Sequence, residues 1–381
     1  MRKLALLFAV TVPVLATPLL GREAPPQAPA QATRPLKLAL FGQSIIRYDL
    51  RRESPESAEQ MTKLINGYDV AFTDFEAVLD KSDLVDGTAR PASRGLIHRA
   101  TSGAMESLKA MGVNMVSLAN NHSFDLGEEG VFSTITGARR AGFAHSGTGA
   151  NIAQAAAPGY LQTAAGLVAL VSFTSPIRAG GEATDDRPGA FHLRFDERTQ
   201  KINEEDRQRA LASVREAAQR APYVMVYHHC HHNEPQRWQV GAWRRQFAHD
   251  LLDAGASLYL AHGTPVNRPI EIYKGKPILY GLSNWIFQVR RPIYYAPDPE
   301  AWRSVLASIT LEENRVSSFT LTPLVLHEQA GEGGVFYPHG APRLATGAQA
   351  KEILQLFADQ SRGFGTEIRI TGETARVNLP R

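Results

Sequence analysis

Apolar segments with the length of buried strands alternate with amphipathic helical segments through the first two-thirds of the chain, and this alternation most constrains the fold. Alternating strands and helices predict a largely parallel or mixed sheet with helices on both faces. Five of the apolar segments end at polar side chains: Gln43; Asp74 and Glu76; Asn120, Asn121 and His122; the histidines from His228 onward; and His262. Because the carboxyl ends of parallel strands share one edge, we expect these five groups to converge.

The densest of these strand ends lies within Val116–Gly130, VSLANNHSFDLGEEG. An apolar run stops at Asn120-Asn121-His122, and Asp125 follows three residues later, before an amphipathic segment begins. This order predicts a strand, a polar loop and a helix, and α/β proteins bind their ligands in such loops. Two amides, an imidazole and a carboxylate within six residues therefore favour a binding site. A loop held together by Asx-turns is the alternative.

Carboxylate, amide and imidazole groups at one edge predict a divalent metal site, and such ligands suit Mn, Fe, Zn or Mg better than copper. His229, or its neighbour His228, is expected to point inward because it directly ends a strand. His231 and His232 are either further ligands or part of a solvated loop. Cys230 offers a soft ligand, although a lone buried thiol is the more usual outcome. The remaining histidines, His98 among them, are expected to be structural or exposed.

Charge and cysteine content restrict the function classes. The 381 residues carry a formal net charge of +3 and contain no run of five or six Lys and Arg residues. The sequence therefore gives no indication of binding to nucleic acid or to an anionic membrane surface. A single cysteine rules out a disulfide within the chain. Export without disulfides fits a bacterial periplasmic or cell-surface protein.

The N-terminal residues have the layout of a secretory signal. Arg2 and Lys3 precede a short apolar stretch that ends in small residues, and the stretch is too short to span a membrane comfortably. We expect residues 1–21 to be a signal peptide and residues 22–35, rich in Pro and Ala, to be a linker. A retained N-terminal anchor is the alternative.

Several motifs resemble one family. Beside ANNH at 119–122, the chain has FTDFE at 72–76, IEIYKGKPI at 270–278 and LSNWIF at 282–287. These segments resemble the CapA proteins of poly-γ-glutamate capsule synthesis, which have the calcineurin-like metallophosphoesterase fold. The resemblance covers the chain from about Leu36 to Phe287.

The resemblance implies an α/β metallophosphatase-like αββα sandwich over residues 36–300. Residues 301–381 are expected to form a small C-terminal appendage of strands and a helix that extends the same domain. Four metal ligands are implied, namely Glu76, Asn121, His229 and His262. Where the family has an acidic residue the chain has Gln43, and Gly263 and Pro265 stand where the family's closing motif has further polar residues. A neutral Gln is a poor substitute for a bridging carboxylate, so one ion is expected rather than two.

If the chain is a metal-dependent hydrolase, His122, which lies beside Asn121, is expected to protonate the leaving oxygen of a substrate while Asp125 orients its ring. Supporting roles, in substrate binding or around the metal ligands, are expected for six residues: Gln43, Asp74, Asn120, His228, His231 and Asn284.

Two function classes remain open. The first is an exported, divalent-metal-dependent hydrolase of phosphoester-type substrates in the metabolism of capsule, poly-γ-glutamate or a related envelope polymer. The second is a non-catalytic capsule-assembly or polymer-binding protein with a degenerate metal site, which Gln43, Gly263 and Pro265 favour. A substrate-binding module of a transporter would leave the histidine cluster unexplained. The expected partners are an envelope polymer or a small phosphoester and membrane proteins of capsule synthesis, with no nucleic acid.

The N-terminal pattern predicts an exported mature chain that starts near Thr17 or a few residues later. Cell fractionation followed by N-terminal sequencing tests this expectation. Recovery of the full-length chain from the cytoplasm would contradict it.

Overall fold

The computed structural model describes residues 34–80, 97–232, 236, 238–289, 298–326 and 340–379. The expected signal peptide and all but the last two residues of the expected linker lie outside these ranges. Within the described ranges, no helix combines the length and the apolar character needed to cross a membrane.

The larger of two central sheets contains ten strands: β1 (Leu36–Ile45), β2 (Val70–Phe75), β5 (Met115–Ser117), β6 (Ala144–Ser146), β17 (Asn284–Phe287), β18 (Arg303–Glu312), β19 (Arg315–Leu326), β20 (Pro342–Leu344), β21 (Ile368–Thr371) and β22 (Thr374–Val377). Their order is β21-β22-β19-β18-β1-β2-β5-β6, with β17 beside β1 and β20 beside β19. Strands β1, β2, β5, β6 and β17 are parallel. Antiparallel pairing of β18 with β1 joins the C-terminal strands to the same sheet.

The smaller sheet contains six strands: β8 (Gly159–Thr163), β9 (Gly166–Ser175), β13 (Tyr223–Cys230), β14 (Leu258–Gly263), β15 (Ile270–Tyr273) and β16 (Lys276–Leu279). Their order is β15-β16-β14-β13-β9-β8, and the middle strands are parallel. The two sheets share one apolar core, in which the rings of Phe72 on β2 and Tyr227 on β13 lie 5.3 Å apart.

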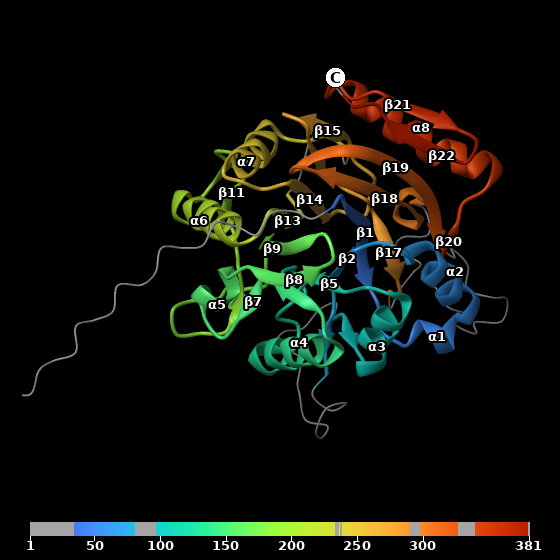
Figure 1. Ribbon diagram of the computed structural model, residues 1–381. Coiled ribbons are helices and arrows are strands. Elements are labelled where there is room, and N and C mark those ends of the chain that lie inside the picture. The colour runs from blue at the N-terminus through green and yellow to red at the C-terminus, as the bar shows by residue number, and fades with distance from the viewer. Residues whose placement is uncertain are drawn as a thin grey trace, which may run out of the picture.

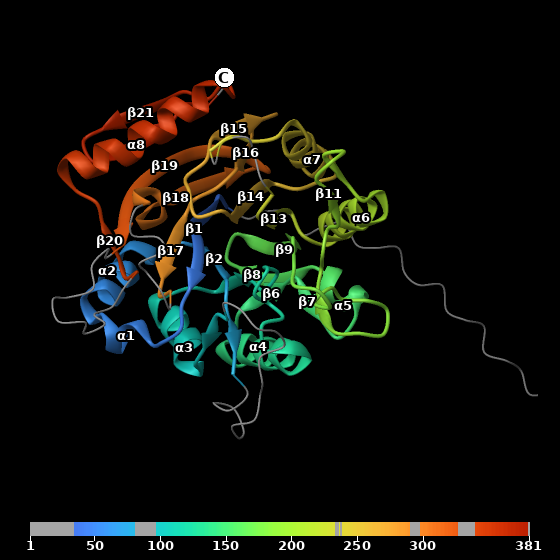
Figure 2. The same cartoon turned by 180° about the vertical axis from the view of Figure 1, so that it is seen from behind.

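Helices cover the outer face of each sheet, as both views show (Figures 1 and 2). Those on the larger sheet are α1 (Leu50–Glu53), α2 (Pro55–Ile65), α3 (Ser102–Met111) and α4 (Gly127–Ala141). Those on the smaller sheet are α5 (Ile152–Ala156), α6 (Glu204–Arg220) and α7 (Ala242–Asp253). Helix α8 (Gly347–Arg362) packs on β19 and β15. The order helix, sheet, sheet, helix confirms the expected αββα sandwich.

Strands β13 and β14 continue through the polar residues that follow their apolar runs. Strand β13 extends to Cys230, and β14 extends to Gly263. The reason is that polar residues stay in the ladder: His229 pairs with His262 across β13 and β14. The histidines therefore lie on the strands themselves, which fixes their rings more firmly than a loop would.

Close packing of β1 against β17 stabilises the edge of the larger sheet at which its parallel strands end. The rings of Phe41 and Trp285 stack with centroids 4.1 Å apart, and both side chains are fully buried. At Gly42 the chain passes so near the Ser283 carbonyl that a Cβ atom would lie 1.8 Å from its oxygen. Only glycine fits there, and the residue after it is Gln43.

Trp285→Ala is expected to lower the free energy of unfolding by about 3–5 kcal/mol, because it removes a fully buried indole and its stack on Phe41. Trp238→Ala is the matched control, since that ring is half exposed, and it should change stability by less than about 0.5 kcal/mol. Denaturant unfolding of both variants measures the difference, and equal losses would contradict the assignment.

Candidate metal centre

Polar side chains from both sheets meet at the rim where the parallel strands end. Asp74 lies on β2 of the larger sheet, and its Oδ2 is 3.2 Å from Nδ1 of His229 on β13 of the smaller sheet. His229 Nε2 is in turn 2.9 Å from Oδ1 of Asn121, in the loop after β5. The convergence predicted from the strand ends is therefore present for these three residues.

Glu76 lies at the centre of this rim, one residue after β2. Its Oε1 is 3.9 Å from His122 Nε2 and 3.8 Å from His229 Nε2. Its Oε2 is buried and has no hydrogen-bond partner among the described residues. Burial raises the pKa of Glu76 well above its usual value, and the nearby carboxylates of Asp74 and Asp125 raise it further.

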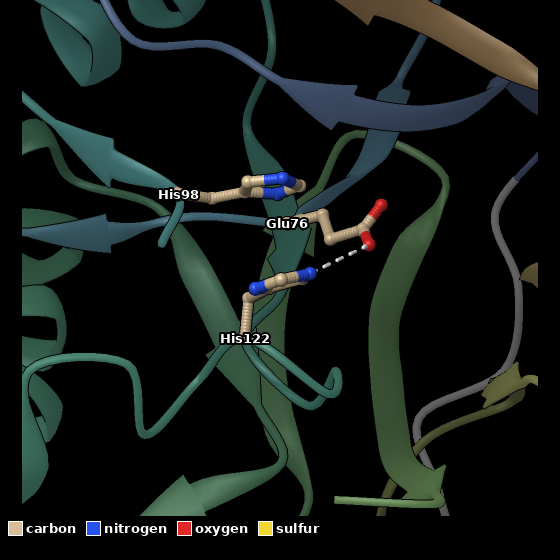
Figure 3. A group of neighbouring side chains, drawn as sticks. All are labelled: Glu76, His98 and His122. Carbon is tan, nitrogen blue, oxygen red and sulfur yellow. Dashed lines mark ion pairs between the residues drawn. The ribbon is translucent and has the colours of Figure 1, made fainter. Parts of the chain in front are cut away.

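Two groups of side chains around Glu76 can hold a metal ion. One contains Glu76, His98 and His122 (Figure 3), and the other contains Glu76, His229 and His231. Within each group the ligand atoms all lie within 4.8 Å of one another. Buried nitrogen atoms of His98 and His231 lack hydrogen-bond partners among the described residues, as does Glu76 Oε2. A divalent cation would satisfy these atoms, so the residues present fit such an ion.

The Asp74–His229 pair controls which nitrogen of His229 is free. Burial raises the pKa of Asp74 to about 8, which outweighs the hydrogen bond from Asn120 Nδ2. Burial also lowers the pKa of His229 well below its usual value, so the ring is neutral. A protonated Asp74 donates to Nδ1, and Nε2–H then donates to Asn121. Once Asp74 ionises, Nδ1–H donates to it and Nε2 keeps a lone pair for a metal.

Asp125 fixes the His122 ring. Its Oδ2 lies 2.8 Å from His122 Nδ1 and accepts a second hydrogen bond from the backbone N–H of His98 at 2.7 Å. Arg178 forms an ion pair with the other carboxylate oxygen. The ring is thereby held with Nε2 toward Glu76. The structure thus brings His122 and Asp125 together as the sequence predicts.

His262 differs from its expected place in the ligand set. Its Nε2 contacts the carbonyl of Ser283, and its Nδ1 accepts from the backbone N–H of Gly263 at 2.5 Å. Both ring nitrogens are therefore engaged with backbone groups, and the ring centroid is 6.4 Å from that of His229. The ring lies beside the two ligand groups and belongs to neither.

Gln43 and Asn284 form a separate neutral pair next to His262. Gln43 Nε2 donates to Asn284 Oδ1 at 2.8 Å and to the Gly263 carbonyl at 3.3 Å. Asn284 Nδ2 donates to the carbonyl of Ala301 at 2.8 Å. Gln43 Oε1 has no partner among the described residues. This pair ties β1 to β14 and β17.

His228 does not line the rim, contrary to the supporting role expected for it. Successive side chains of a strand point to opposite faces, so His228 and His229 diverge. The Nε2 of His228 is 2.7 Å from Ser175 Oγ, and its Nδ1 is 2.8 Å from the hydroxyl of Tyr259. His228 is buried on the helix-covered side of β13, between the rings of Phe173 and Phe247.

Asn120 shapes the loop and also contacts Asp74, to whose Oδ1 its Nδ2 donates at 3.3 Å. Its Oδ1 accepts from the backbone N–H of His122 at 3.1 Å, which is the Asx-turn considered as the alternative. Its Nδ2 donates to the Phe75 carbonyl at 2.9 Å. The turn made by Asn120 presents Asn121 and His122 to the rim, so the Asx-turn is compatible with a binding site, which stays a prediction.

His98 is the residue that sequence reasoning missed. It precedes β4 (Arg99–Ala100), which pairs with β3 (Val78–Leu79), and its ring is buried. The ring stacks on His122 with centroids 3.7 Å apart. No motif or spacing in the sequence links it to Glu76, because 21 residues without a clear period separate the two.

Comparison with known proteins gives consistent matches. Residues 37–289 match the family described as "Bacterial capsule synthesis protein PGA_cap". The uncharacterized protein y4sH of Sinorhizobium fredii is 28% identical, over 90% of this chain and 93% of its own length. The PGA biosynthesis protein CapA of Bacillus subtilis is 25% identical, over 69% of this chain and 66% of its own length. The capsule biosynthesis protein CapA of Bacillus anthracis is 24% identical, over 79% of this chain and 70% of its own length.

The raised pKa of Asp74 predicts a specific pH dependence for the metal-free protein. Because the folded chain holds the Asp74 proton up to about pH 8 and the unfolded chain loses it near pH 4, this group lowers stability progressively between those values. Asp74→Asn cannot ionise, so its advantage over wild type should grow from pH 4 to pH 8 and then level off. Unfolding free energies of both proteins across this range provide the measurement. A difference that does not change with pH would show that Asp74 ionises normally.

Proposed function

Because the chain belongs to the Bacterial capsule synthesis protein PGA_cap family, we propose that it is a divalent-metal-dependent hydrolase of phosphoester-type substrates in capsule, poly-γ-glutamate or related envelope-polymer metabolism. One observation carries the proposal: the buried Glu76 carboxylate faces His122 and His229 and keeps one oxygen without a partner among the described residues. A buried carboxylic acid in this state keeps its proton or is matched by a cation, and the neutral rings of His229 and His231 beside it offer lone pairs to such a cation.

Glu76, His229 and His231 would hold the ion, with Asn121 Oδ1 beside His229 Nε2. Such an ion polarises a scissile phosphoester group and lowers the pKa of bound water. Asp74 sets the tautomer of His229, and burial keeps the pKa values of His229 and His231 low, so both rings are neutral as ligands must be.

The Asp125–His122 pair supports the proposal in a second way. Asp125 holds the ring so that Nε2 faces Glu76, and Arg178 neutralises the carboxylate behind it. The same orientation suits a proton donor to a leaving oxygen and a metal ligand. In either role His122 acts largely shielded from bulk solvent, because only 7% of the residue is exposed.

A non-catalytic polymer-binding protein is the second candidate, and Gln43 favours it. In the metallophosphoesterases that the chain resembles, this position carries an acidic metal ligand. Here it carries the neutral amide of Gln43, which donates hydrogen bonds to Asn284 and to the Gly263 carbonyl. His262 is likewise engaged with backbone groups. A binder of this kind requires no stoichiometric ion, which separates it from the hydrolase. Under both candidates we propose export and contact with membrane proteins of capsule synthesis.

Glu76→Gln tests the hydrolase. The variant should lose stoichiometric metal, and its hydrolysis of aryl phosphate mono- and diesters should fall at least about 10²-fold, because the neutral amide cannot balance the ion's charge. Metal analysis of purified wild type, reloaded with Mn²⁺, Zn²⁺, Fe²⁺ or Mg²⁺, accompanies the assay. Glu182→Gln, which alters a half-exposed carboxylate paired with Arg187, is the control. Wild type without stoichiometric metal and without hydrolysis would favour the polymer-binding alternative.

A further inference from the structure

We propose that a groove between residues 238–241 and the end of α8 binds a neutral saccharide chain, with one sugar ring stacked on Trp238. The groove encloses about 610 Å³, which is within the usual range of small-ligand sites. Its lining residues lie outside both ligand groups of the metal centre. The inference therefore goes beyond the proposed function, and it applies to a hydrolase and to a polymer-binding protein alike.

Trp238 gives the groove an aromatic surface. The residue is 50% exposed, whereas Trp285 is fully buried in the core. Val240, Pro269 and Phe364 line the same groove, so the exposed indole belongs to a cluster of apolar side chains. A single exposed apolar residue is ordinary, but an apolar cluster that polar residues surround marks a binding surface. The cluster indicates a ligand with an apolar face.

Both sides of the groove are held by one short segment. The buried guanidinium of Arg268 donates from Nη1 to the Gln239 carbonyl at 2.6 Å, which holds the side that carries the indole. Two residues later, the backbone N–H of Ile270 donates to Ser361 Oγ at 3.0 Å, which holds the end of α8. Pro269 lies between these two anchors and lines the groove. A surface fixed in this way costs less entropy when it takes up a ligand.

Charge favours a neutral ligand over an anionic one. Among the described residues that line the groove, Asp359 carries the only ionisable side chain. Its carboxylate forms an ion pair with Arg362 and accepts a hydrogen bond from Gln355, and both partners lie on the same helix. An acidic polymer such as poly-γ-glutamate would meet a carboxylate there and no lining Lys or Arg. Like charges at an interface oppose binding, so a neutral chain fits this groove better.

Amide side chains supply the polar contacts that a sugar requires. Gln360 Oε1 is buried and has no hydrogen-bond partner among the described residues. The last torsion of a glutamine is soft, so this oxygen can turn into the groove and accept from a hydroxyl group. Gln239, on the opposite side, is exposed and offers a second amide.

A pyranose ring combines the two properties that the groove selects. One of its faces is covered by C–H bonds, which carry partial positive charge, and its hydroxyl groups lie around the edge. The face of an indole is negative, so the C–H face of the sugar packs favourably on Trp238. In that orientation the hydroxyl groups point outward, toward the amides of Gln239 and Gln360. An aliphatic ligand would leave both amides without partners.

Saccharide binding by the full chain tests the inference. Chitotetraose, cellotetraose and maltotetraose are titrated into the protein by calorimetry, and acrylamide quenching of tryptophan fluorescence reports on the half-exposed Trp238. At least one of the three should bind with a dissociation constant of about 1 mM or lower and should protect Trp238 from acrylamide. Binding should persist in EDTA, because the groove contains no metal ligand.

Four variants locate the bound sugar. Trp238→Ala should weaken binding at least about tenfold, because it removes the stacking surface. Trp238→Tyr keeps an aromatic face and should retain most of the affinity. Gln360→Leu keeps the size of the side chain but removes the amide, and it should weaken binding about three- to tenfold. Phe132→Ala, which removes an exposed ring on α4, is the matched control and should bind as wild type does. Circular dichroism checks that each variant is folded.

The opposing outcomes are distinct from those of the hydrolase test. Absence of binding by all three saccharides would overturn the groove and leave the metal centre untouched. Binding of a γ-glutamyl oligomer in their place would identify an acidic polymer as the ligand and would also overturn it. Saccharide binding that Trp238→Ala retains, or that EDTA abolishes, would place the sugar elsewhere. Protection of Trp238 that rises with protein concentration alone would identify a contact between two copies of the chain instead.

Discussion

The burial of the Glu76 carboxylate is the constraint on which the rest of the rim depends. A carboxylate removed from water must be protonated or matched by positive charge. Arg178 does not supply this charge to Glu76, because its guanidinium forms an ion pair with Asp125. What surrounds Glu76 instead is a set of neutral imidazoles with lowered pKa values, His98, His229 and His231 among them. Neutral rings around a buried acid are the environment of a metal centre, since they offer lone pairs rather than competing charge.

The two-sheet architecture is what makes this burial possible. Parallel strands of both sheets end at one rim, so side chains separated by more than 150 residues, such as Asp74 and His229, come within hydrogen-bonding distance. The ladder between β13 and β14 holds His229 opposite His262. On the other side the larger sheet is irregular next to the site, with register shifts at Gln43 against both β2 and β17. These shifts coincide with Gly42, where backbone from β1 and Ser283 meets without room for a side chain.

Periodicity predicts the alternating strands and helices, and polar residues placed after apolar runs predict the converging strand ends, whereas the αββα sandwich is predicted by the resemblance to a known family. The sequence leaves the choice between His228 and His229 open, since only the pairing of β13 decides which ring faces the rim. It also assigns His262 as a ligand, although the backbone of Ser283 and Gly263 engages both nitrogens. His98 could not be predicted at all, because its position depends on the short pairing of β3 with β4 and not on any local pattern.

The neutral residue at Gln43 and the buried acids of the rim are two parts of one electrostatic argument. A bridging centre built on Gln43 lacks the negative charge that holds two cations together, and its amide is committed to Asn284. The acids of the rim are Glu76, Asp74 and Asp125, and the carboxylates of Asp74 and Asp125 raise the pKa of Glu76 beyond the effect of its burial. A buried carboxylate crowded by other acids is stabilised either by a proton or by a cation, so the crowding that holds a proton on Glu76 also favours a divalent ion in the place of that proton.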